Sequence, residues 1–132
     1  MKLITRDTDY AIRALICIAG EKGNIVSVVG LSKKMSMPKA YLRKILQQLN
    51  KSKLLKSSKG KGGGFSLTCN PQKVTVFSLI EIFQGSFQLS EHIFKGKKCP
   101  EMKTCRLKKR LDEIDKTVTQ KLKAITLFSL MK

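Results

Sequence analysis

The sequence has 132 residues, a formal charge of +18 and a single histidine. This length predicts one compact domain, and an ordinary apolar share of 42% predicts a buried core. With one histidine, no Ser-His-Asp set and no cofactor fingerprint, an enzyme with a small-molecule substrate is the weakest class of function. The charged start MKLITRDTDY and the lack of a long apolar run predict a cytoplasmic protein with no signal peptide and no membrane span.

The positive charge is concentrated in the middle of the chain. Between Glu21 and Glu81 the sequence has twelve lysines and arginines and no acidic residue. A solvated face normally mixes both signs, so a surface this uniform indicates a polyanionic partner. Nucleic acid is the leading partner, and an anionic membrane surface is the weaker alternative.

The first predicted element is an amphipathic helix in DYAIRALICIAGEKG, residues 9–23. Asp7 or Thr8 is expected to cap its start, and Gly23 follows its end. Its inner stripe is expected to contain apolar residues at spacings of three and four: Ile12, Leu15, Ile16 and Ala19.

Two more helices follow, separated by a tight turn. Ser27 is suited to cap a short helix, SVVGLSKKM, which ends at the break from Ser36 to Pro38. Pro38 suits the first position of a third helix, because the N–H it lacks would have no partner there. This spacing predicts a helix-turn-helix.

The third helix is predicted to have two faces. Its apolar stripe consists of Leu42, Ile45, Leu46 and Leu49. Its other face consists of Lys39, Ala40, Arg43, Lys44, Gln47 and Gln48, with Tyr41 at the edge. Arginine pairs with guanine, glutamine with adenine and lysine with phosphate, so this face suits the major groove of double-stranded DNA. The alternative is an ordinary surface helix with long polar side chains.

The stretch LLKSSKGKGGGFSLT, residues 54–68, predicts a β-hairpin. Its tip contains Lys59, Gly60 and Lys61, followed by three glycines that permit close approach to a phosphate or positive φ angles. The run is not a P-loop, since no GK[ST] opens a following helix. It is either a flexible turn or, placed after a helix-turn-helix, a wing for the minor groove.

The C-terminal third predicts two further helices. One runs through VFSLIEIFQG, with Thr75 as its cap and Gly85 as its end. The other is long and has an apolar seam of Leu107, Leu111, Ile114, Val118, Leu122 and Ile125. The seam predicts a homodimer; the alternative is packing against its own domain.

Five motifs resemble those of the Rrf2 family of bacterial winged-helix transcription factors. They are TDYAIRAL (8–15), YLRKILQQL (41–49), GKGGGFSL (60–67), CPEMKTCRLKK (99–109) and ITLFSL (125–130). The resemblance implies a mainly α fold with a small β-hairpin wing, arranged as a winged helix-turn-helix plus a long C-terminal dimerisation helix. It divides the chain into a DNA-binding domain (1–85), a sensor loop (86–104) and a dimerisation helix with a tail (105–132).

The resemblance also implies DNA contacts at Lys39, Ala40, Tyr41, Arg43, Lys59 and Gly60. Two residues depart from the family pattern. Ser36 and Lys53 stand where glycine is usual, and both are expected to strain a left-handed turn.

Cluster-binding members of the family have three cysteines in the sensor loop, of which this chain keeps Cys99 and Cys105. His92 lies near the place of the first, and imidazole replaces thiolate in some two-iron clusters. Asp9 matches a ligand that such members take from the first helix of the other subunit. The resemblance thus implies a regulator, expected to be a repressor, that senses redox, iron–sulfur or nitric-oxide status.

Several alternatives stay open. The same ligands suit zinc, or the chain has no cofactor and a redox-active thiol pair. Cys17 and Cys69 are expected to be small apolar fillers, with redox sensing as the second interpretation. A cofactor-free regulator and a non-specific RNA-binding protein are the alternative functions; most aromatic residues lie in apolar stripes, which disfavours RNA.

Overall fold

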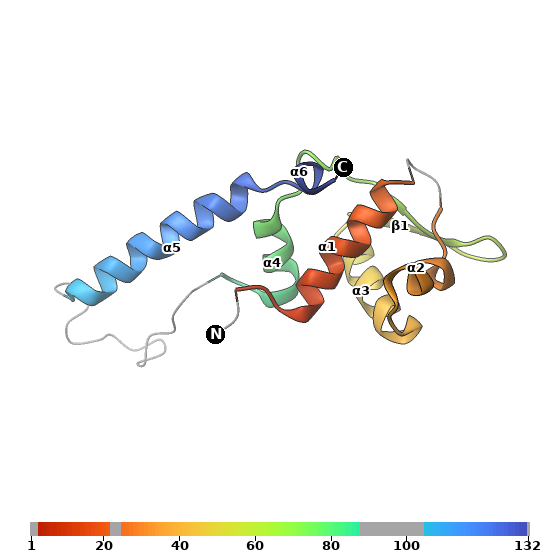
Figure 1. The fold of residues 1–132 in the computed structure, drawn as a ribbon, viewed down its shortest axis with the longest axis horizontal. Helices are drawn as coiled ribbons and strands as arrows, with labels where there is room; N and C mark the ends of the chain where they lie inside the picture. The colour runs from red at the N-terminus through yellow and green to blue at the C-terminus, as the bar shows by residue number, and fades with distance from the viewer. Residues whose placement is uncertain (1–2, 22–24, 88–104, 132) are drawn as a thin grey trace.

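The computed structural model describes residues 3–21, 25–87 and 105–131. The elements are α1 (Arg6–Ala19), α2 (Val28–Met35), α3 (Lys39–Lys51), β1 (Leu55–Ser58), β2 (Gly64–Leu67), α4 (Val76–Gln84), α5 (Arg106–Ala124) and α6 (Leu127–Leu130). The strands form one antiparallel hairpin, so the predicted mainly α fold with a β-hairpin is confirmed. In Figure 1 the hairpin and α5 project from opposite ends of the molecule.

Helix α1 lies at the centre of the main core. Its fully buried face contains Ala11, Ala14, Leu15 and Ile18. The predicted stripe is thus half right: Leu15 and Ala19 are buried as expected, whereas Ile12 and Ile16 are only partly buried. Spacing of the largest apolar residues misled the prediction, whereas the small alanines form the face that packs within the core.

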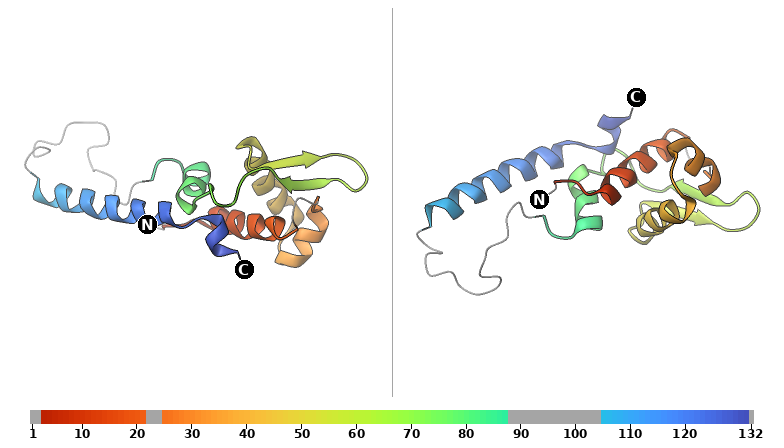
Figure 2. Two further views of the ribbon diagram at one scale, coloured as in Figure 1. Left: turned by 90° about the horizontal axis from the view of Figure 1, so that it is seen from above. Right: turned by 60° about the horizontal axis from the view of Figure 1, so that its bottom comes forward.

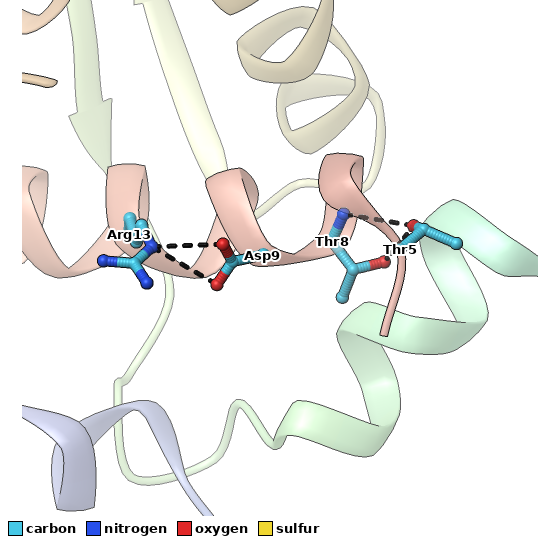
Figure 3. A network of polar contacts seen from close by, with 4 residues as sticks. All are labelled: Thr5, Thr8, Asp9 and Arg13. Carbon is cyan, nitrogen blue, oxygen red and sulfur yellow. Dashed lines mark hydrogen bonds and ion pairs between the residues drawn. The ribbon is translucent and has the colours of Figure 1, made fainter. Parts of the chain in front are cut away.

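The start of α1 also differs from the prediction. Its N-cap is Thr5, whose side chain accepts a hydrogen bond from the backbone N–H of Thr8 (Figure 3). Neither Asp7 nor Thr8 caps the helix. Thr8 is instead fully buried, and its hydroxyl donates to Oε1 of Gln84 at 2.7 Å. The helix ends at Ala19, and the predicted terminator Gly23 lies outside the described residues.

The helix-turn-helix forms as expected, except that α3 starts one residue later than predicted. Ser27 caps α2 as predicted, accepting from the N–H of Gly30 at 3.0 Å. Ser36 adopts the left-handed conformation expected from the family pattern, with φ 53° and ψ 50°. Pro38 is the N-cap of α3 rather than its first helical residue, and its carbonyl accepts from Leu42.

The hairpin is anchored to the helices by its second strand. Leu55 pairs with Leu67 and Ser58 with Gly64, which leaves residues 59–63 as the tip. Phe65 is buried and forms an antiparallel bridge with Val26, just before α2. The hairpin therefore has a fixed position beside the helix-turn-helix (Figure 2). We call this hairpin, residues 55–67, the wing.

The C-terminal segment completes the core of the N-terminal part. Thr75 caps α4 as predicted, in a capping box with Ser78, and Gly85 follows the end of the helix as its C-cap. Leu127 of α6 lies in the main core, and its N–H donates to the carbonyl of Val74 at 2.8 Å. The division at residues 85 and 104 remains a prediction, but the 105–132 segment contributes a core residue to the 1–85 segment.

Candidate nucleic-acid interface

Helix α3 separates its two kinds of side chain as the sequence predicts. Leu42, Ile45, Leu46 and Leu49 are all buried in the main core. The residues on its outer side are exposed: Lys39, Ala40, Arg43, Lys44 and Gln47. We call these five residues the reading face. Because the apolar stripe is covered by the protein itself, the reading face is oriented outward by the core.

The cations of this surface have no anionic partner in the described part of the chain. The ion pairs recorded there belong to α1 and α5, where Asp9 contacts Arg13, Asp112 contacts Lys108 and Glu113 contacts Arg110. Lys59 and Lys61 are exposed at the tip of the wing. As far as the described residues go, the reading face and the wing thus present positive charge that an external anion can neutralise.

Tyr41 is the exception among the predicted contacts. It is partly buried, and its ring lies at 83° to that of Tyr10 with the two centroids 5.8 Å apart. Its hydroxyl donates to the carboxylate of Asp7. Burial, followed by this hydrogen bond, raises the pKa of Tyr41 to about 12. Sequence reasoning missed Asp7, since no spacing links residues 7 and 41.

The glycines of the wing meet two different backbone requirements. Gly60 and Gly62 have φ angles of 90° and 81°, which L side chains rarely adopt. A Cβ on Gly63 would lie 2.3 Å from the carbonyl oxygen of Ser58, and one on Gly64 would lie 2.2 Å from that of Val26. The backbone conformation of the wing therefore requires these glycines, independently of any contact with a phosphate.

A groove of about 580 Å³ lies beside the C-terminal half of the reading face. It is lined by Lys44, Gln47, Gln48, Lys51, Ser52 and Ile82. Gln48 is not free to read a base, because its amide donates to the carbonyl of Ile82 at 2.8 Å. Lys51 was not predicted as a contact, although it lies two turns after Lys44 on the same side of α3.

The structure describes two of the four candidate cofactor ligands. His92 and Cys99 lie outside the described residues. Cys105 is the N-cap of α5, where its Sγ accepts from the N–H of Lys108 at 3.4 Å. Asp9 is paired with Nε of Arg13 at 3.2 Å, and its side chain is 48% exposed (Figure 3). Within residues 3–21, 25–87 and 105–131, no three histidine, cysteine or acidic side chains form a metal-binding group.

The other two cysteines pack as small apolar residues. Cys17 and Cys69 are partly buried against the main core. Burial raises the pKa of the Cys69 thiol, which makes it less reactive at neutral pH. Both observations favour the filler interpretation.

The seam of α5 divides into two halves. Leu107 and Ile114, in the first half, are 67% and 50% exposed. Val118 and Leu122, in the second half, pack against Val76 and Ile80 of α4. The alternative of packing against the domain therefore holds for Val118 and Leu122, while the first half has an exposed apolar surface. Ile125, the last predicted member of the seam, is the C-cap of α5 and is 37% exposed. None of the described helices has the length and apolarity needed to span a membrane.

Comparison with known proteins identifies the family. The model of the Rrf2 family, described as an iron-dependent transcriptional regulator, matches residues 4–132. NsrR of Bacillus licheniformis, an HTH-type transcriptional regulator, is 31% identical over 116 residues, covering 86% of this chain and 80% of NsrR. A candidate HTH-type regulator of Aquifex aeolicus is 28% identical over 124 residues, covering 92% and 86%.

Among solved structures, CymR, the global cysteine regulator of B. subtilis, superposes with a TM-score of 0.78. The two chains are 24% identical, and the match covers 98% of this chain and 96% of CymR. This likeness confirms the winged-helix fold. The chain belongs to the Rrf2 family and is a DNA-binding transcriptional regulator, not an enzyme.

Proposed function

We propose that this protein acts in the cytoplasm as a homodimeric repressor that binds a specific double-stranded DNA site. Helix α3 enters the major groove with the reading face, and the wing reaches the adjacent minor groove. The observation that carries the proposal is the complete separation of α3 into a buried apolar stripe and an exposed face with Arg43, Lys44 and Gln47.

The proposed DNA contacts have several different roles. Arg43 and Gln47 have side chains that suit base edges, and Lys39 and Lys44 suit phosphates. Lys59 and Lys61 bring charge to the minor groove, where Gly60 allows the backbone to approach closely. Ala40 is small enough to leave room for a base or a thymine methyl group.

Dimerisation is proposed from the exposed half of the α5 seam. Leu107 and Ile114 lie seven residues apart on one side of α5 and are 67% and 50% exposed, so they form an apolar surface that a second copy could cover. A twofold dimer places its two reading helices about 34 Å apart, so we expect a pseudopalindromic site.

The second part of the proposal is that the protein senses redox, iron–sulfur or nitric-oxide status through a bound cofactor. The two described candidate ligands fit an iron–sulfur cluster in their chemistry, since Cys105 offers a thiol at a helix start and Asp9 a half-exposed carboxylate. Cys105 begins α5 at the end that points away from α1, which suits a ligand set shared between two chains (Figure 1). His92 and Cys99 would complete the set. A bound cluster would supply redox chemistry, and zinc or a cofactor-free thiol pair are the competing forms.

DNA reading is tested by footprinting and titration of genomic fragments. Arg43→Ala is expected to relax base preference at one position, at about 1 to 3 kcal/mol. Lys59→Ala is expected to weaken binding to all sequences and to lower the salt slope by about one. The matched control is Lys121→Ala, an exposed cation of α5. Equal affinity for all duplexes would exclude specific regulation and favour RNA binding.

Sensing is tested separately by anaerobic reconstitution with iron and sulfide. Charge-transfer absorption in the wild type that is altered in His92→Ala and Asp9→Ala would support the ligand set. A colourless, iron-free wild type whose DNA affinity ignores both metal and thiol oxidants would leave a cofactor-free regulator.

A further inference from the structure

The first turn of α1 is a junction where hydrogen bonds join three helices. From α4, Oε1 of Gln84 accepts from the N–H of Thr5 at 2.9 Å and from the hydroxyl of Thr8 at 2.7 Å. Between these residues, Asp7 accepts from the hydroxyl of Tyr41 on α3. The start of α1 thus connects the end of α4 with the first turns of the reading helix.

Helix α3 has few other polar contacts that fix its position. Its N-cap, Pro38, has no side chain to cap the helix. Among the described residues, the side chains of α3 that bond to another helix are Tyr41 near its start and Gln48 near its end. The buried apolar stripe sets which side of α3 faces the core, and these two bonds add polar contacts that limit small rotations of the helix about its own axis. Rotation decides where Lys39 and Arg43 point.

We propose that Asp7 is a positioning residue for DNA reading: by accepting the Tyr41 hydroxyl, it fixes the first turns of α3 and so orients Lys39 and Arg43. This proposal rests on the proposed function. A carboxylate beside a phosphate-binding surface repels DNA, so its presence there needs an offsetting contribution. Holding Tyr41 supplies one.

In the competing explanation, Tyr41 contacts DNA directly and Asp7 has no positioning role. In that case its hydroxyl donates to a DNA phosphate, and Asp7 merely opposes binding. The two roles predict opposite results for Asp7 variants. Positioning requires an acceptor oxygen at residue 7, whereas electrostatic opposition depends only on its charge.

Asp7→Ala and Asp7→Asn form a matched pair, because both remove the charge and only asparagine keeps an acceptor oxygen. With Tyr41→Phe and the Asp7→Ala/Tyr41→Phe double variant, each is titrated with a specific and a random duplex. We expect Asp7→Ala and Tyr41→Phe each to lower specific affinity by about three- to tenfold, with no further loss in the double variant. Asp7→Asn should bind at least as tightly as wild type, since its oxygen accepts the same hydrogen bond and the repulsive charge is lost.

Two outcomes would overturn the proposal. One is that Asp7→Ala and Asp7→Asn change affinity alike, which is the result of charge removal. The other is that Tyr41→Phe weakens binding while Asp7→Ala does not, which is the result of a direct phosphate contact. Circular dichroism of each variant distinguishes a repositioned α3 from an unfolded domain.

The contact has its own readout that needs no DNA. Tyr10 and Tyr41 are the two tyrosines of a chain without tryptophan, so ultraviolet absorbance follows two phenols. In Tyr10→Phe only Tyr41 titrates. Its pKa is raised from an ordinary 10.0 to about 12, so the stability from its neutral form is present below pH 10.0 and is lost as the pH rises through about 12.

Removing Asp7 from the Tyr10→Phe protein is expected to lower the pKa of Tyr41, leaving the part of the shift that comes from burial. An unchanged pKa would show that the contact is absent and would end the proposal. If the pKa falls but the wild type binds no specific duplex, the proposed function fails while the contact stands. The two failures are therefore distinguishable.

Discussion

Helices α3 and α5 have the same apolar spacing and the same excess of basic residues, but their stripes have different surroundings. Every member of the α3 stripe is buried by the chain itself, and Leu46 is fully inaccessible. In α5, Ile114 is half exposed, and burial begins only toward the C-terminal end. A stripe at spacings of three and four therefore predicts that a surface will be covered, but not which chain covers it.

Their polar contacts differ in the same way. Side chains of α3 bond to α1 and α4, through Tyr41 to Asp7 and Gln48 to Ile82. Two ion pairs lie within α5 itself, joining Lys108 to Asp112 at 2.7 Å and Arg110 to Glu113 at 3.7 Å. Thus α3 is fixed in its domain by both kinds of contact along its length, whereas α5 contacts α4 through its C-terminal half, by apolar packing and by Lys123 over the ring of Phe77.

The largest expected effect is loss of the α3 stripe. Leu46→Ala leaves a cavity in the main core, so the free energy of unfolding should fall by about 2 to 5 kcal/mol. Urea denaturation followed by circular dichroism measures it. The next residue, Gln47, is exposed, and Gln47→Ala should stay within about 0.5 kcal/mol of wild type. Equal stability of the two variants would contradict the buried stripe.

A substitution in the apolar seam of α5 is expected to weaken dimer formation and not the stability of the domain. Ile114→Asp places a charge in the exposed half of the seam of each chain, so we expect dimer affinity to fall about 100-fold. Light scattering should then give the mass of one chain, 14.8 kDa, with unchanged circular dichroism.

Gln120→Asp adds the same charge to α5 outside the seam and serves as the control for this dimer test. Val118→Asp should also break the dimer, but it is less specific, because Val118 packs against its own domain. An Ile114→Asp protein that stays dimeric would assign the interface to another surface.

Glycine substitutions in the two turns that flank α3 are expected to stabilise the protein, with a smaller effect than the substitutions above. Ser36 precedes the helix and Lys53 follows it, with φ angles of 53° and 65°. Left-handed geometry costs L residues about 1 kcal/mol, so Ser36→Gly and Lys53→Gly should each raise the melting temperature by a few degrees. Thermal unfolding measures the gain. A loss in either variant would mean that its side chain stabilises the turn.

The smallest effect is expected for the ion pairs of α5. Asp112 raises the pKa of Lys108 through a hydrogen bond on an exposed helix surface. Asp112→Asn should leave the denaturation midpoint almost unchanged, because water and salt screen an exposed ion pair. Denaturation in low and high salt checks this, and a loss as large as that of Leu46→Ala would show that the surface of α5 is buried in the dimer.

Elements whose signal is local could be predicted from the sequence. The stripe of α3, the caps at Ser27 and Thr75 and the glycine-rich turn all depend on residues a few positions apart, and all lie where expected. The family pattern also anticipated the left-handed Ser36. The outward face of α3 follows from its stripe, so most of the candidate interface was predictable.

Features that depend on distant residues could not be predicted. Thr5 caps α1 within a junction that includes Gln84, and Tyr41 turns from the reading face toward Asp7. The inner face of α1 is set by alanines packed within the core, and periodicity of large apolar residues gives alanine little weight. The place of Leu127 in the core depends on a backbone bond to Val74, more than fifty positions earlier.

The contact between Leu127 and Val74 forms late during synthesis of the chain. The chain is made from the N-terminus, so α1, α2, α3 and the wing leave the ribosome well before Leu127. Their shared core lacks one buried side chain, and Val74 lacks a hydrogen-bond partner, until residue 127 has emerged. The DNA-binding end therefore reaches its final packing after α5 has been made, so the segment expected to join two copies is already available when the reading helix becomes fixed.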